Sequence, residues 1–283
     1  MHARTMLVCS MLLTPFAAAA QSATQPTDQP THQPADFQPP LPGYTLFWHD
    51  EFNGDTLDTT RWSVWRPGPR RDAINVPEAV VLDGQGHLTL TTTRHQLEDG
   101  TTEFRTGGVW THDTFRTRYG YFEARMKMQQ EFGHWAAFWI QTPTMGKVIG
   151  DPGASGVEID VIEYHKKQPG IAQNTIHWDG YGDDHKSAHH KHKLPDIAEG
   201  WHTYAVLWTP DELVFYVDGK ESWRTDAAVP RVEQFMILSL EVGTWAGDIN
   251  AANLPDGIMI DWVRVWKPGN AESVGASEDS SPE

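Results

Sequence analysis

The stretch Gly156-Val157-Glu158-Ile159-Asp160-Val161-Ile162-Glu163-Tyr164 places three carboxylates within six residues of an otherwise apolar, β-branched sequence. Its valines and isoleucines favour a buried β-strand, and no helix cap precedes them. Side chains alternate along a strand, so Glu158 and Asp160 share one face. Strict alternation would turn Glu163 to the opposite face, but a β-bulge near Val161-Ile162 would bring it back to the face of Glu158 and Asp160. The sequence therefore predicts a bulged strand with three acids on one face.

Three neighbouring carboxylates repel one another, so the arrangement costs stability unless a site uses it. Cleavage of a glycosidic bond uses such acids: one attacks the anomeric carbon while a second, protonated, donates to the leaving oxygen. Retention of configuration requires a separation of roughly 5–5.5 Å. Glu158 and Glu163 have side chains long enough for this, and Asp160 between them would separate their pKa values. The alternative is a solvated strand edge that carries acids by chance.

The motif resembles the active-site strand E-x-D-x-x-E of glycoside hydrolase family 16 in its bulged form. Further stretches resemble other segments of that family, with Ala136 where the family usually has Pro. In chain order they are WHDEFNG at 48–54, YGYFEARMK at 119–127, GHWAAFW at 133–139, VDGK at 217–220 and DWVRVW at 261–266. The resemblance covers residues 43 to 267. It implies Glu158 as nucleophile, Glu163 as general acid/base and Asp160 as the carboxylate between them.

The remaining sequence predicts an all-β fold. About a dozen runs rich in β-branched and aromatic residues alternate with turn residues, and helical periodicity is almost absent. This pattern is typical of a sandwich of two antiparallel sheets. The resemblance implies the jelly-roll version, in which one concave face forms a substrate cleft.

The ends of the chain predict segments outside this domain. Residues 1–20 combine a positive start, a short apolar core and a run of alanines, as in a secretory signal peptide cleaved near Ala20. The only cysteine, Cys9, lies within it, so no disulfide is expected after cleavage. Residues 21–42 read as a Pro/Gln/Thr-rich linker, 43–267 as the catalytic domain and 268–283 as a disordered acidic tail. We therefore expect a secreted or periplasmic protein.

Composition excludes several classes of partner. The formal net charge of −16 argues against nucleic acid and anionic membrane surfaces, and it disfavours sulfated polysaccharides. The 13 tryptophans suit stacking on sugar rings. We expect a β-glucan substrate, no membrane insertion and a monomer.

The resemblance also suggests residues that contact substrate. Trp135 and Trp139 match aromatics beside the catalytic strand, although either residue also fits core packing. The other candidates are His177, Trp178, Trp110 and Asn75. His177 is placed near the acid/base, and Asn75 has a longer spacing to the next motif than the family usually has.

The sequence contains two candidate metal sites, the His-rich segment at 185–192 and the pair Glu51 and Asp261. The His-rich segment at 185–192 fits no helical zinc spacing and contains lysines, so it predicts a solvated loop or a wall of the cleft. The resemblance implies a structural calcium held by the backbone carbonyl of Glu51 and the carboxylate of Asp261. No cofactor is required for the predicted reaction.

These observations predict a retaining endo-β-glycanase that hydrolyses β-1,3- or mixed β-1,3/1,4-glucan by double displacement. Three alternatives remain open at this level. They are an agarase- or carrageenase-like galactan hydrolase, a glucan transglycosylase and a non-catalytic glucan-binding domain.

Overall fold

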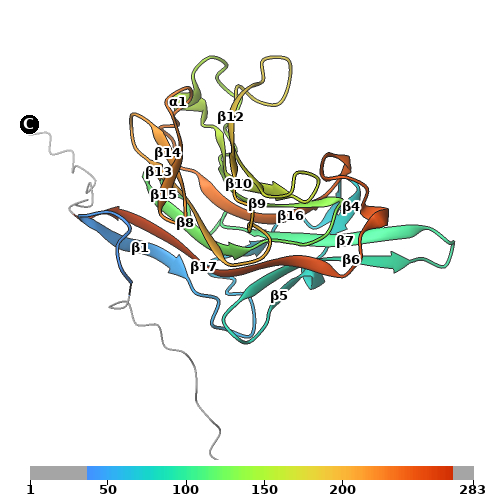
Figure 1. Ribbon diagram of the computed structural model, residues 1–283. Helices are drawn as coiled ribbons and strands as arrows, with labels where there is room; N and C mark the ends of the chain where they lie inside the picture. Colours follow the sequence, from blue (N-terminus) through green and yellow to red (C-terminus); the bar gives the residue numbers. More distant parts are fainter. Residues whose placement is uncertain (1–36, 270–283) are drawn as a thin grey trace, which may run out of the picture. The chain divides into compact units, whose positions relative to one another are not determined.

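A computed structural model of the chain describes residues 37–269. The predicted signal peptide with Cys9, most of the predicted linker and nearly all of the acidic tail lie outside the described residues. The described part is an all-β jelly-roll sandwich, as the sequence predicts (Figure 1). It contains four very short helical segments: η2 (Pro77–Ala79), α1 (Pro152–Ser155), η3 (Thr244–Ala246) and η4 (Ile249–Ala251).

The first sheet is centred on the long closing strand β17 (Asp256–Pro268). One edge of β17 pairs with β1 (Tyr44–Asp50) and β6 (Leu88–Gln96), and β5 (Val80–Leu82) extends beyond β6. Its other edge leads through β8 (Gly120–Lys127), β13 (His202–Trp208) and β14 (Leu213–Val217) to β15 (Lys220–Thr225).

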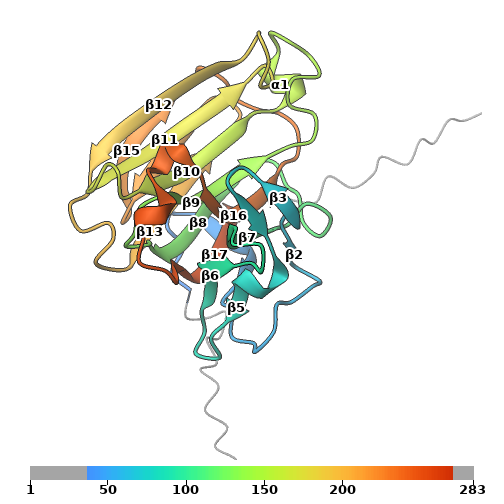
Figure 2. The same cartoon turned by 90° about the vertical axis from the view of Figure 1, so that its right-hand side faces the viewer.

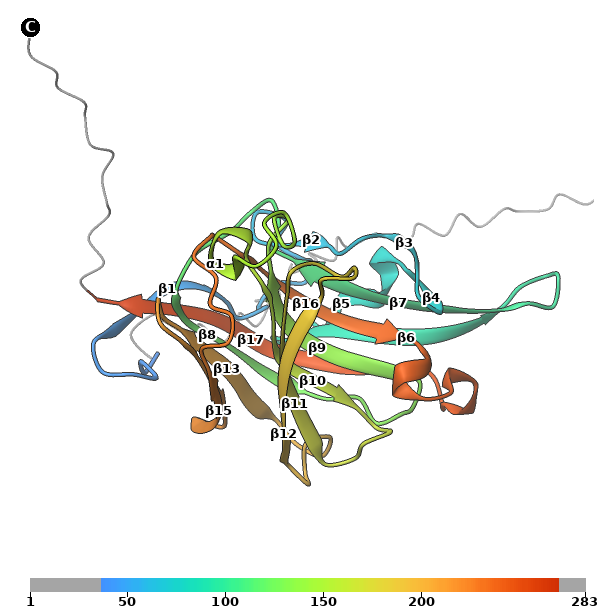
Figure 3. The same ribbon diagram turned by 90° about the horizontal axis from the view of Figure 1, so that it is seen from above.

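The second sheet carries the predicted active-site strand, β10 (Glu158–His165). In spatial order it contains β12 (Lys186–Lys193), β11 (Ile171–Trp178), β10, β9 (His134–Gln141), β16 (Phe235–Val242), β7 (Thr102–Trp110) and β2 (Ser63–Val64). Figure 3 shows β12, β11, β10 and β9 in this succession. A short hairpin of β3 (Gly68–Arg70) and β4 (Ala73–Asn75) lies beside β7, as Figure 2 also shows.

The main core lies between the two sheets. From the first sheet it takes the alternate residues Phe122, Ala124 and Met126, and from the second Phe138 and Ile159. The opposite faces of β9 and β10 are therefore left for a site. Side chains alternate along β9, and Ala136, Phe138 and Ile140 all belong to this core.

Two features differ from expectation. The segment 185–192 was expected to be a solvated loop or a wall of the cleft, but Lys186 to Lys193 form strand β12, which pairs with β11 along its whole length. The loop prediction was wrong because an edge strand packs little core, so backbone pairing rather than apolar alternation decides its structure. The alternative of a cleft wall is confirmed, because His185, Ser187 and His189 line the cleft on this sheet. Phe37 and Leu41, within the predicted linker, pack with Tyr121 and Trp266, so contacts with the domain begin before residue 43.

Candidate active site

A cleft of about 750 Å³ lies on the face of the second sheet that is turned away from the core. Five strands of this sheet and the β3–β4 hairpin contribute its walls. The lining side chains include Trp135, Trp139, Gln141, Glu158, Asp160, Glu163, Gln173, Thr175, His177, His189, Glu241, Arg70 and Arg71. The cleft therefore brings together all three carboxylates of the predicted motif.

A β-bulge in β10 produces this convergence. On the β11 side, Asp160 pairs with Thr175 and Glu163 with Gln173, so three steps along β10 correspond to two along β11. The register with β9 shifts between Asp160 and Ile162. One extra residue therefore lies in β10 near Val161, and it returns Glu163 to the face of Asp160. The predicted bulge is confirmed.

Glu158 accepts two hydrogen bonds that stabilise its charged form. Gln141 Nε2 donates to Glu158 Oε2 over 2.9 Å, and the hydroxyl of Tyr181 donates to the same oxygen. Burial raises the pKa of Glu158, whereas the Tyr181 hydrogen bond, the charge of His177 and the Gln141 hydrogen bond oppose the rise. The local environment therefore favours a carboxylate at this position more than at Glu163.

Glu163 has weaker support for a negative charge. Its Oε2 accepts from Thr175 Oγ1 at 3.2 Å and from Gln173 Nε2 at 3.4 Å. Burial raises the pKa of Glu163 well above its usual range, and the charges of Asp160 and Glu158 raise it further. A carboxyl group in this environment retains its proton to higher pH, as a general acid requires.

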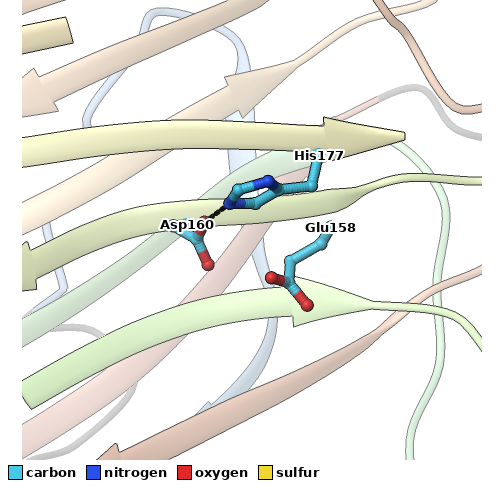
Figure 4. A group of neighbouring side chains, drawn as sticks. All are labelled: Glu158, Asp160 and His177. Carbon is cyan, nitrogen blue, oxygen red and sulfur yellow. Dashed lines mark ion pairs between the residues drawn. The ribbon is translucent and has the colours of Figure 1, made fainter. Parts of the chain in front are cut away.

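Asp160 lies between these two groups and contacts His177. Burial raises its pKa well above the usual range, and the neighbouring charge of Glu158 adds to this effect. The Nε2 atom of His177 lies 3.4 Å from Asp160 Oδ2, and Figure 4 shows the His177 ring reaching Asp160 from β11. On its other side, His177 Nδ1 lies 2.9 Å from Nε2 of His185. His177 was expected near the acid/base, but its direct contact is with the middle carboxylate.

Two arginines beside the cleft share one buried acid. Arg70 and Arg71 both contact the Glu241 carboxylate, at 3.0 and 2.6 Å. The Arg71 guanidinium also lies over the ring of Trp135, 5.1 Å from its centre. This arrangement fixes the β3–β4 hairpin beside β9 and β16 and holds Trp135 against the hairpin.

Of the six residues predicted to contact substrate, three line the cleft and three do not. Trp135, Trp139 and His177 line the cleft. Trp178 instead packs against the main core, and Trp110 packs against Phe235 with its ring stacked on His112. Asn75 is buried and donates to the backbone carbonyl of Trp65 over 3.2 Å, which gives it a role in holding the hairpin. These last three are not among the residues that line the cleft.

The Asp261 carboxylate, one of the two predicted calcium ligands, has a protein partner, as does the side chain of Glu51. Arg125 donates to the Asp261 carboxylate, and Arg264 pairs with the Glu51 carboxylate at 2.8 Å. A cation at Asp261 would have to compete with a guanidinium that already neutralises the carboxylate, so Asp261 does not fit a calcium site well. The role of the Glu51 backbone carbonyl stays a prediction, because the ion pair with Arg264 involves only the side-chain carboxylate. Within the described part of the chain, the one group of three or more acidic and histidine side chains whose ligand atoms converge is Glu158, Asp160 and His177.

Sequence reasoning missed several residues of the cleft. Glu241 carried a usable signal, because a lone acid within the apolar strand Phe235–Val242 is unusual in the same way as Glu158. Tyr181 and Arg71 lie in connections whose path the sequence does not determine, and Arg70 ends the three-residue strand β3, so no comparable signal was available for them.

Comparison with known proteins gives concordant results. The profile "Glycosyl hydrolases family 16" matches residues 70–264. The chain is 30% identical to "Glucan endo-1,3-beta-glucosidase A1" of Niallia circulans, covering 81% of this chain and 39% of that protein. It is 27% identical to "Keratan-sulfate endo-1,4-beta-galactosidase" of Sphingobacterium multivorum, covering 79% and 55% respectively. The chain thus spans about half the length of the curated relatives it matches.

The solved laminarinase catalytic domain of Thermotoga maritima superposes with a TM-score of 0.67 at 25% identity, covering 79% of this chain and 98% of that one.

Proposed function

The chain belongs to glycosyl hydrolase family 16, and on that basis we propose that it is a retaining endo-β-glucanase acting on β-1,3- or mixed β-1,3/1,4-glucan. One observation carries the proposal: the bulge in β10 presents Glu158 and Glu163 in the same cleft, in environments that favour different protonation states. The name of the Niallia circulans relative supports a glucan as substrate.

The proposed reaction has two displacement steps. In the first, a carboxylate oxygen of Glu158 forms a bond to the anomeric carbon, while Glu163 transfers its proton to the departing glycosidic oxygen. In the second, Glu163 takes a proton from water, and the resulting hydroxide displaces Glu158 from the sugar. Two inversions restore the original configuration, and both carboxyl groups return to their starting protonation states.

An uncharged substrate fits the overall negative charge of the protein. Arg70 and Arg71 share the single carboxylate of Glu241, which offsets one of their two positive charges. The net charge of −16 opposes binding of a polyanion. The net charge therefore favours a glucan over a sulfated galactan.

The substrate assignment is tested by a reducing-sugar assay on laminarin, lichenan, agarose and carrageenan. We expect product from laminarin or lichenan, with the β-anomer formed first when the reaction is followed by NMR. Glu158→Gln should lower turnover by on the order of 10⁴-fold or more while substrate binding persists. Activity confined to agarose or carrageenan would overturn the glucan assignment.

Two other functions give different results in the same experiments. A transglycosylase would lengthen oligosaccharides, which mass spectrometry of the products detects. A glucan-binding domain would bind laminarin without turnover in the wild type as well. The three carboxylates in one cleft support catalysis over simple binding.

Export and a monomeric state are also part of the proposal. The pattern of residues 1–20 supports secretion or export to the periplasm, which N-terminal sequencing of the exported protein would test. Size-exclusion chromatography with light scattering would test the monomer. Within residues 37–269, no helix has the length and apolar content needed to cross a membrane.

A further inference from the structure

Tyr181 has an unusual combination of exposure and contact. The residue is 63% exposed, in the connection between β11 and β12, yet its hydroxyl reaches into the cleft and donates to Glu158 Oε2. Burial of the hydroxyl and the charge of Glu158 raise the pKa of Tyr181 above its usual value. The phenol therefore stays protonated and acts as a hydrogen-bond donor to the carboxylate.

The turn that carries Tyr181 is held from several sides. Asp179 and Gly180 adopt left-handed backbone conformations, with φ of 62° and 79°. The buried Asp179 carboxylate accepts from the backbone N–H of Gly150 at 2.9 Å and from Lys186 Nζ at 2.7 Å. Gly146 packs closely against Gly180, since an added Cβ at Gly146 would lie 2.7 Å from the Gly180 Cα. A non-glycine residue in a left-handed conformation costs free energy, and it persists here because the surrounding contacts over-determine the turn.

Both donors to Glu158 select the same oxygen. Gln141 and Tyr181 donate to Oε2, and Gln141 Nε2 also donates to the Tyr181 oxygen over 2.6 Å. Among the described residues, no hydrogen bond to Oε1 of Glu158 is present. The carboxylate is thus held by one oxygen, while the other keeps its lone pairs free.

We propose that Tyr181 is a positioning residue that fixes Glu158 through Oε2 and leaves Oε1 to attack the anomeric carbon. This inference rests on the proposed function. When the Oε1–carbon bond forms, the glycosidic oxygen leaves with the electron pair of the broken bond and takes the proton of Glu163. Oε2 becomes the ester carbonyl oxygen and keeps its two donors, so the covalent intermediate needs no rearrangement of this part of the site.

Tyr181 also determines which acid carries the proton. Glu158 faces the acids Asp160 and Glu241, which favour its neutral form, and His177, which favours its charged form. A donor that bonds only to the carboxylate shifts this balance toward an ionised Glu158. Without it, Glu158 would compete with the other acids of the cleft for the proton that Glu163 must hold.

The direct test is Tyr181→Phe, which removes the hydroxyl and keeps the ring. We expect kcat/KM on the preferred glucan to fall about tenfold to a hundredfold, the range for loss of one hydrogen bond to a charged group. The acid limb of the pH profile should move to higher pH, because the pKa of Glu158 rises when its donor is lost. Tyr216→Phe, in β14 of the other sheet, is the matched control and should change neither quantity. An unshifted acid limb in Tyr181→Phe would overturn the inference.

A double-mutant cycle tests whether the turn acts through the hydroxyl. Asp179→Ala should lower kcat/KM in the wild-type background and have little further effect in Tyr181→Phe. Equal effects in the two backgrounds would show that the turn contributes independently of the hydroxyl, against the inference.

A titration separates this inference from the proposed function. Carboxyl ¹³C NMR, with the Glu158 signal assigned from Glu158→Gln, reports the pKa of Glu158 whether or not a substrate is turned over. We expect a higher pKa in Tyr181→Phe than in wild type and Tyr216→Phe. An inactive wild type with this shift would reject the glucanase alone, while an active wild type without the shift would reject the role of Tyr181 alone.

Discussion

Asp160 and Glu163 are three residues apart in β10, yet their partners in β11, Thr175 and Gln173, are only two residues apart. This mismatch places both acids on one face of the sheet. In a regular strand Glu163 would point between the sheets, where an unpaired charge is costly. The bulge therefore serves the site and the core together: it turns an acid outward and keeps Val161 and Ile162 buried.

Glu163→Gln should affect substrates according to their leaving groups. Glycan hydrolysis should fall by about 10²–10⁴-fold, because the leaving oxygen loses its proton donor. A glucoside with a dinitrophenolate leaving group needs no such proton and should still release the phenolate, which is measured by its absorbance. An equal loss on both substrates would contradict the acid role.

The pH dependence of the wild type gives a second measure of Glu163. The group acts when protonated, and its folded-state pKa is raised well above 4.5. Activity is therefore lost as the pH rises through this raised value, and the basic limb of kcat/KM should lie well above pH 4.5. Glu163→Gln should lack this basic limb on the dinitrophenyl substrate.

Asp160→Asn should stabilise the protein near neutral pH while lowering its activity. A raised folded-state pKa means that the stability present below the unfolded value of 3.8 is lost as the pH rises toward the folded value. Removing the charge should raise stability by on the order of 1 kcal/mol, or about 2–4 °C in the thermal midpoint. The gain should vanish well below pH 3.8. Asp99→Asn, whose exposed carboxylate has a lowered pKa, should give no gain; a gain there as well would point to a general charge effect.

Trp135 and Trp110 should respond differently to truncation. Trp135 lines the cleft, so Trp135→Ala should raise KM about tenfold through loss of an apolar platform for sugar. Trp110 packs against Phe235, so Trp110→Ala should lower the free energy of unfolding by about 2 kcal/mol and leave KM unchanged. Steady-state kinetics and urea unfolding measure both effects, and a raised KM for Trp110→Ala would place that residue in the substrate path.

Glu241→Gln should expose the charges of two arginines. The side chain is buried and pairs with Arg70 and Arg71, so its loss should destabilise the protein by about 3 kcal/mol. The unpaired guanidinium groups should also increase retention on carrageenan in affinity electrophoresis, because they can then bind sulfate. Glu212→Gln removes a partner of the exposed Arg224 and should change stability by less than about 1 kcal/mol. Unchanged retention for Glu241→Gln would contradict the neutralising role of Glu241.

The sequence by itself determined the fold class, the face assignments of β10, and the bulge that gathers the three acids. These follow from local rules: β-branched residues favour strands, side chains alternate, and a charge cannot stay buried without a partner. The same rules fail for β12, because a His- and Lys-rich edge strand such as Lys186–Lys193 has no apolar period to detect.

The tertiary structure alone decided the neighbours of each acid. Tyr181 and Gln141 meet Glu158 from a loop and an adjacent strand, and Glu241 meets two arginines about 170 residues away in the chain. The tertiary structure also determined that Trp110 and Trp178 pack against other apolar side chains and that Trp135 lines the cleft. An indole ring suits both a protein core and a platform for sugar. The residue type alone therefore does not predict which of these two positions a tryptophan occupies. Only the packing of distant segments determines which face of a side chain meets water, and that packing is not encoded in any local pattern.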